Sequence, residues 1–108
     1  GWNHREHHAH LVDFYQKLID RAADYGYSNV IVFSGNRNGL DDETGLINCA
    51  QGLQRILPQA EKRGVNLVME LLNSKVDHHD YQADHTVWGV ELAKTIGSER
   101  FSLLYDIY

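Results

Sequence analysis

The feature that most constrains the fold is a repeat in which a short apolar run follows a helix-like segment ending in glycine. The apolar runs begin at Asn29, Asn66 and Phe101, so successive starts are 37 and 35 residues apart. The glycines that precede them are Gly26, Gly64 and Gly97. Strands joined by helices in this way form a parallel sheet with right-handed crossovers. The sequence therefore predicts tandem helix-then-strand units of an α/β fold.

Three strands are expected, over residues 29–33, 65–72 and 101–107. Each is a nearly continuous run of apolar, often β-branched, residues and does not alternate with polar ones. Runs of this kind are typical of parallel strands whose two faces are both covered. We therefore expect each strand to be buried on both faces.

The helical segments show the three- and four-residue spacing of amphipathic helices. The first is expected over residues 4–25, with its histidine-rich start in solvent. The second carries an apolar stripe over residues 46–60 and should break near Pro58, because proline cannot continue the backbone hydrogen bonds of a helix. Asp84 or Thr86 is expected to cap the third helix.

Two architectures satisfy this pattern, an open doubly wound sheet and an eight-stranded (β/α)8 TIM barrel. The evenness of the repeat favours the barrel. Because a complete barrel takes about 250 residues, the 108 residues predict a partial TIM barrel of about three parallel strands with their helices. We expect residues 1–108 to be a single partial domain, a central segment of a barrel truncated at both ends.

Composition excludes several classes of partner. The net charge of −5 offers no broad cationic face for a phosphate backbone, so nucleic acid is not an expected partner. The apolar runs fall far short of the ~20 residues that span a bilayer, so no membrane partner is expected either. The single cysteine, Cys49, fits a reducing compartment. We expect a soluble, cytoplasmic protein; its oligomeric state does not follow from the sequence.

Two carboxylates interrupt the second and third apolar runs at equivalent positions. Glu70 and Asp106 each stand late in a predicted strand, where an unpaired buried carboxylate would be costly. Carboxyl ends of parallel strands meet at one edge of the sheet, so the two side chains are expected to point into one cavity. A divalent cation such as Mg²⁺, Mn²⁺ or Zn²⁺ would compensate both. The alternative is that each pairs with an arginine or lysine of another strand.

Three ordered motifs give the chain a family resemblance. They are Val-Phe-Ser-Gly-Asn-Arg at 32–37, Met-Glu-Leu-Leu-Asn-Ser-Lys-Val-Asp-His at 69–78 and Leu-Leu-Tyr-Asp-Ile-Tyr at 103–108. Together with the segments 80–81 and 86–92, they resemble the hydroxypyruvate isomerase family of xylose isomerase-like barrels. The resemblance spans about residues 22–108. It implies an isomerase that interconverts hydroxypyruvate and tartronate semialdehyde through an ene-diolate, as part of carbohydrate metabolism.

The resemblance also implies roles for individual residues. Glu70 resembles the strand-end glutamate of the family, an acid/base residue that also binds the metal in related isomerases, and Asp106 resembles the next metal ligand. The family's following histidine and its second catalytic glutamate do not occur in these 108 residues. The 108 residues alone are therefore expected to be inactive.

Residues beyond the strand ends are candidates for binding the substrate, a small hydroxy-keto acid or sugar. Arg37 would bind an anionic group through paired hydrogen bonds, and Asn73 would read a hydroxyl or carboxylate. For Arg37, a salt bridge to Asp41 or Asp42 is an equally good interpretation. Lys75 and Asp77 are more typical of solvated loop charges.

The remaining candidates favour structural roles. His4 and His8 have a spacing that can bind zinc, but nothing completes a four-ligand set. His78 and His79 are interpreted as loop residues, and Trp88, like Cys49, as a buried residue of the core.

Two rival functions remain open. One is a ketose 3-epimerase or another sugar isomerase of the same superfamily, which would share the strand-end carboxylates. The other is a non-catalytic half-barrel module that binds a metabolite or assembles with copies of itself.

Overall fold

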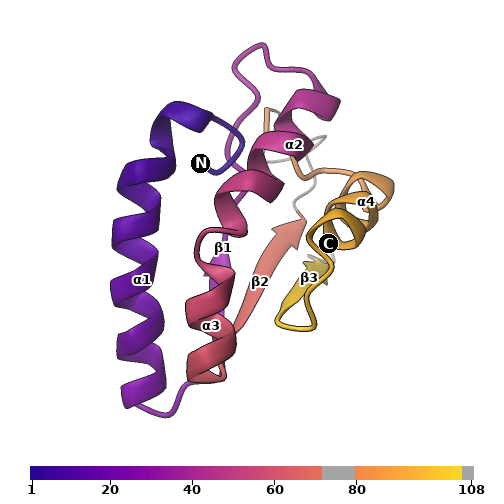
Figure 1. Cartoon of the computed structure of the whole chain (residues 1–108). Coiled ribbons are helices and arrows are strands. Elements are labelled where there is room, and N and C mark those ends of the chain that lie inside the picture. Colours follow the sequence, from indigo (N-terminus) through magenta and orange to yellow (C-terminus); the bar gives the residue numbers. More distant parts are fainter. Residues whose placement is uncertain (72–79, 106–108) are drawn as a thin grey trace.

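A computed structural model describes residues 1–71 and 80–105 of the chain. Its element order is a 3-10 turn at Arg5–His7 and then α1 (His8–Asp24), β1 (Asn29–Val32), α2 (Asp42–Leu53), α3 (Leu57–Arg63), β2 (Asn66–Leu71), α4 (Thr86–Ile96) and β3 (Phe101–Tyr105). The three strands form one parallel sheet in the order β1-β2-β3, with Asn29 opposite Asn66 and Leu67 opposite Phe101 (Figure 1). The predicted α/β fold with three parallel strands is confirmed.

Local chemistry accounts for the helix ends. Asp41 begins α2, and its carboxylate accepts a hydrogen bond from the Thr44 N–H at 3.1 Å. Pro58 stands in the first turn of α3, where its missing N–H costs nothing, so the predicted break falls between α2 and α3. Gly64 and Gly97 end α3 and α4 in the left-handed conformation that glycine adopts without strain.

The cap expected for the last helix was wrong. His85, rather than Asp84 or Thr86, is the N-cap residue of α4, and its side chain makes no capping hydrogen bond. The Asp84 carboxylate is turned toward the Arg37 guanidinium, 2.8 Å away. The Asp84 carboxylate also lies 2.8 Å from His85 Nδ1.

The helices cover one face of the sheet. Because two successive right-handed crossovers join neighbouring strands in the order β1-β2-β3, the connecting helices fall on the same side. Helix α1 joins them by packing against β1 and α3. Figure 1 shows these helices as one layer over the strands. A doubly wound sheet carries helices on both faces, so this arrangement is that of a barrel segment.

The buried side chains lie between this helical layer and the sheet. From the strands they are Val30, Val32, Leu67, Met69, Leu71 and Phe101, and the fully buried residues from the helices include Ile19, Leu53, Ala60 and Leu92. Trp88 and Cys49 belong to the same core, as the sequence predicted.

The expectation that the strands are buried on both faces was wrong. Burial alternates along β1 and β2, and the residues turned away from the helices stay accessible. Ile31, Phe33 and Leu104 are 44%, 45% and 43% exposed. An apolar strand residue of a barrel faces either the helices or the barrel interior, and the three described strands leave the interior face open. We call this surface the inner face; it also carries Val68, Glu70 and Ser102.

The start of the chain is also more buried than the sequence indicated. Trp2 and Asn3 are fully buried, and the Nε2 atom of His8 donates to the Trp2 carbonyl at 2.7 Å. The Asn3 N–H in turn donates to the Ser34 carbonyl at 2.8 Å, beyond the end of β1. A Cβ atom at Gly52 would lie 2.6 Å from the Trp2 ring, so the glycine makes room for this segment. His8 is thus a packing residue, not part of a solvated helix start.

Candidate functional site

The segments that follow the strands gather at one edge of the sheet. All three strands run in parallel, so their carboxyl ends share this edge, where α/β proteins bind their ligands. The loop after β1 meets residues 80–83 there in a short antiparallel contact, with Asn36 opposite Tyr81. The Arg37 N–H donates to the Asp80 carbonyl at 2.7 Å, and the Gln82 N–H donates to the Gly35 carbonyl at 2.9 Å. Two loops distant in sequence therefore form one support at this edge.

Glu70 lies at this edge, on the inner face of β2. It pairs in register with Leu104 of β3 and alternates with the buried Met69 and Leu71. The residue is only partly buried, and its carboxylate makes no hydrogen bond or ion pair with any other residue in the described ranges. The expectation that this carboxylate is fully buried is therefore wrong, while its compensation by a cation or a basic residue stays a prediction. The carboxylate thus lies on the inner face, at the carboxyl end of β2.

Tyr81 connects the ends of β1 and β2, a role that the sequence did not reveal. Its hydroxyl accepts a hydrogen bond from the Ser34 N–H and donates one to the Glu70 carbonyl, both at 3.0 Å. Burial raises the pKa of this phenol, so the hydroxyl keeps its proton and can donate at neutral pH. The partners are 47 and 11 residues away, and only the segment 80–81 of the family resemblance pointed to this position.

The Arg37 side chain, in the loop after β1, forms hydrogen bonds with the segment around Tyr81. Its guanidinium donates to the Asp84 carboxylate at 2.8 Å, to the Tyr81 carbonyl at 2.7 Å and to the Asp42 carboxylate at 3.2 Å. Burial alone would lower the pKa of Arg37, but the hydrogen bonds with Asp84 and Asp42 outweigh it and raise the pKa. The structure thus contains the salt bridge to Asp42 that was one of the two interpretations. The substrate-binding role of Arg37 stays a prediction, since these donors are already engaged.

His4, His8 and Cys49 take structural positions. The His4 Nε2 atom donates to the Asn36 carbonyl at 2.8 Å, so His4 and His8 are held by different backbone groups. Over residues 1–71 and 80–105, no three histidine, cysteine or acidic side chains lie close enough to hold a metal ion. Burial raises the pKa of the Cys49 thiol strongly, which keeps it protonated and unreactive.

Several predicted site residues fall in ranges that the structure does not describe. Residues 72–79 contain Asn73, Lys75, Asp77, His78 and His79, and residues 106–108 contain Asp106. The predicted convergence of Glu70 and Asp106 therefore stays a prediction.

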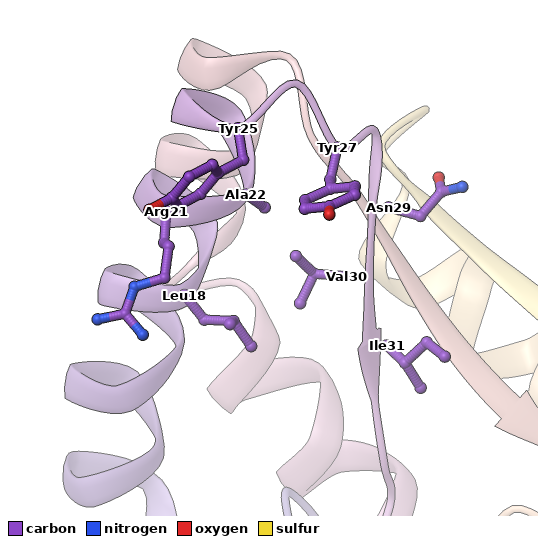
Figure 2. Close-up of a pocket in the computed structure, with 8 residues that line it drawn as sticks. All are labelled: Leu18, Arg21, Ala22, Tyr25, Tyr27, Asn29, Val30 and Ile31. Carbon is purple, nitrogen blue, oxygen red and sulfur yellow. The ribbon is translucent and has the colours of Figure 1, made fainter.

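A hollow of about 610 Å³ lies away from this edge, between α1 and β1 (Figure 2). Leu18 and Ala22 line it from the helix and Val30 from the strand, while Tyr25 and Tyr27 flank it at the amino-terminal end of β1. It contains no acid and lies along the outer edge of β1, which has no neighbouring strand in the described sheet. Its position and apolar lining are those of a packing surface and do not suit proton transfer.

No helix in the described ranges has both the length and the apolar character needed to cross a membrane.

Comparison with known proteins yields one family and one solved structure. A family model described as "Xylose isomerase-like TIM barrel" matches residues 2–108. The fold is similar to that of D-psicose 3-epimerase with D-tagatose from Clostridium cellulolyticum H10, with a TM-score of 0.73 and 17% sequence identity. The match covers 88% of this chain and 34% of the epimerase chain, so this chain spans about a third of that protein's length. No protein of curated function matches the sequence significantly.

Proposed function

The chain belongs to the xylose isomerase-like TIM barrel family, and from this premise we propose that the full-length protein is an isomerase acting on a small hydroxycarbonyl compound. The observation that carries the proposal is the position of Glu70. Its carboxylate stands at the carboxyl end of β2, on the inner face, with no hydrogen bond or ion pair to another described residue. A carboxylate in this position can serve as the acid/base group.

Glu70 would remove the proton from the carbon next to the carbonyl of the bound substrate. The electron pair of the broken C–H bond moves toward the carbonyl carbon, and an ene-diolate forms as negative charge develops on the carbonyl oxygen. Return of a proton to the neighbouring carbon completes the isomerisation. Glu70 supplies one half of this acid/base pair; the second group would come from outside the 108 residues.

A divalent cation (Mg²⁺, Mn²⁺ or Zn²⁺) is proposed to assist. The Glu70 carboxylate fits as one ligand, since it is partly exposed and makes no bond to another described side chain, and Asp106 is proposed as a second. When bound, the cation would polarise the substrate carbonyl and stabilise its developing charge. Hard cations of this kind prefer carboxylate oxygens.

The substrate we propose is hydroxypyruvate, in exchange with tartronate semialdehyde. The support comes from the motifs at 32–37, 69–78 and 103–108, which resemble those of hydroxypyruvate isomerases. The alternative is a ketose 3-epimerase, which the likeness of the fold to D-psicose 3-epimerase favours. Both reactions use strand-end carboxylates, so the inner face is compatible with either.

Turnover by the full-length protein separates these substrates. We expect conversion of hydroxypyruvate, followed by proton NMR of the products, and incorporation of one solvent deuteron at the carbon that receives the proton. Activity on D-psicose and D-tagatose alone would replace the proposal with the epimerase. No turnover of any of the three compounds would support a non-catalytic module.

A metal role for Glu70 and Asp106 predicts a change in cation affinity. In a calorimetric titration of the full-length protein with Mn²⁺, Glu70→Gln and Asp106→Asn should each weaken binding by at least about tenfold, since even outer-shell partners of metal ligands contribute 10–100-fold. Glu61→Gln is the matched control, because Glu61 is an exposed residue of α3. Unchanged affinity in both site variants would remove the metal from the proposal.

A further inference from the structure

The hydrogen-bond ladder between β1 and β2 contains an inserted side chain at its carboxyl end. The strands are in register from Asn29 opposite Asn66 to Val32 opposite Met69. One more step of this register aligns Phe33 with Glu70. The parallel pattern would then send the Ser34 N–H directly to the Glu70 carbonyl.

The Tyr81 hydroxyl stands between those two groups. It accepts a hydrogen bond from the Ser34 N–H and donates one to the Glu70 carbonyl. Two hydrogen bonds of 3.0 Å therefore replace one direct bond of about 2.9 Å. The bridge lies at Glu70, the residue proposed to carry the acid/base carboxylate. Tyr81 thus joins the backbones of Ser34 and Glu70 where the ladder between β1 and β2 ends, on the side of Glu70 that faces away from β3.

Tyr81 is itself fixed from both sides. Its side chain is 4% exposed, and its own carbonyl accepts a hydrogen bond from Arg37 at 2.7 Å. Two residues further along, the Ala83 N–H donates to the Ser34 Oγ at 3.0 Å. Because Ser34 is bonded to both Tyr81 and Ala83, the hydroxyl cannot shift without disturbing the support formed by the two loops.

We propose that Tyr81 is a positioning residue, whose hydroxyl holds Glu70 in register for proton transfer. The inference rests on the proposed function of Glu70. Its physical basis is that proton transfer needs the base within hydrogen-bond reach of the substrate carbon, and a misplacement of about 1 Å can cost on the order of 100-fold in rate. Substrate binding depends less on that alignment, so the role should affect kcat and leave KM nearly unchanged.

The test compares Tyr81→Phe with Tyr15→Phe in the full-length protein. Tyr15 is a matched control: it is 7% exposed, and its hydroxyl donates to the Ile31 carbonyl of β1 at 3.2 Å. Each variant loses one buried tyrosine hydroxyl, and both should lower the melting temperature by a few degrees. For Tyr81→Phe we expect kcat to fall about tenfold with KM within about twofold, whereas Tyr15→Phe should leave both within about twofold.

A second measurement tests the inserted bond without reference to activity. Amide hydrogen exchange at Ser34 should accelerate in Tyr81→Phe, whose ring no longer accepts the Ser34 N–H, and stay unchanged in Tyr15→Phe. If Tyr81→Phe does not fold, 3-fluorotyrosine at position 81 takes its place, because fluorine weakens the oxygen as an acceptor while the ring remains. Fluorine also makes the hydroxyl a stronger donor to the Glu70 carbonyl, so the readout of this variant is exchange at Ser34, and an unchanged rate there would overturn the inserted bond.

The positioning role of Tyr81 and the proposed function of Glu70 can fail separately in these experiments. Assays use hydroxypyruvate, D-psicose and D-tagatose as the probes, with Glu70→Gln measured alongside. If Glu70→Gln abolishes turnover but Tyr81→Phe behaves like Tyr15→Phe in kcat, the positioning role is overturned and the proposed function stands. If Glu70→Gln keeps its activity, or no probe is turned over, the proposed function fails and the positioning role fails with it.

Discussion

Replacing Glu70 by glutamine in the full-length protein is expected to lower kcat by roughly 10²–10⁴-fold, the range that a positioned general acid or base contributes. Glutamine has nearly the same shape but cannot accept a proton from carbon. Since the Glu70 side chain makes no hydrogen bond or ion pair with a described residue, the substitution should leave the melting temperature within about 2 °C of the parent protein.

Steady-state kinetics and a thermal melt of the same preparations check this result. Glu61→Gln serves as the control, as it removes an equivalent charge from the exposed surface of α3 and should leave kcat within about twofold. A Glu70→Gln enzyme with more than about a third of the parent kcat would show that another group carries the proton. A melting temperature lowered by many degrees would show that Glu70 has a structural partner.

Replacing Arg37 by methionine is expected to have the largest effect on stability, about 2–4 kcal/mol in the free energy of unfolding. Methionine keeps the apolar stem but leaves the Asp84 carboxylate, whose side chain is 7% exposed, without the guanidinium at 2.8 Å. It also leaves the Tyr81 carbonyl without that donor. Breaking a buried ion pair costs about 3–5 kcal/mol; we reduce that range because the Arg37 side chain is 22% exposed and because His85 Nδ1 also lies 2.8 Å from the Asp84 carboxylate.

Urea denaturation of the full-length protein measures this loss as a lower midpoint with an unchanged slope. Arg55→Met is the control, because Arg55 is exposed and forms no ion pair with a described residue; it should change stability by less than about 0.5 kcal/mol. The experiment also decides between the two interpretations of Arg37. Unchanged stability with a KM raised tenfold or more would assign the guanidinium to the substrate in place of the loops.

The sequence predicted the parts of the fold that depend on local chemistry. The spacing of the three apolar runs identified the parallel strands, Pro58 located the break between α2 and α3, and Gly64 and Gly97 marked helix ends. Each of these signals acts within a few residues of its own position. These signals can therefore be recognised without knowledge of the tertiary structure.

Burial was harder to predict, because an apolar residue looks the same whichever face it occupies. Ile31 and Val32 are adjacent and similar, yet Val32 is fully buried under the helices and Ile31 is 44% exposed on the inner face. His8 was misassigned for the converse reason. Its burial depends on Trp2, which occupies the space left by the absent side chain of Gly52.

The candidate site was predicted in part. The place of Glu70 at the carboxyl end of its strand followed from its position in an apolar run, and the structure confirms that place. The bonds of Arg37 to Asp84 and of Tyr81 to Ser34 span 47 residues each. No local sequence pattern encodes such contacts, so these hydrogen bonds near Glu70 could be found only from the three-dimensional structure.

The alternation along each strand has a consequence for how such a protein can be rewritten. Met69 and Leu71 are buried under the helices, whereas Val68, Ser102 and Leu104 lie on the inner face and are partly or largely exposed among the described residues. If the inner face binds the substrate as proposed, we expect substitutions at these latter positions to act on substrate binding more than on the packing of the helices. Neighbouring residues of one strand thus belong to two different surfaces, one covered by helices and one on the inner face.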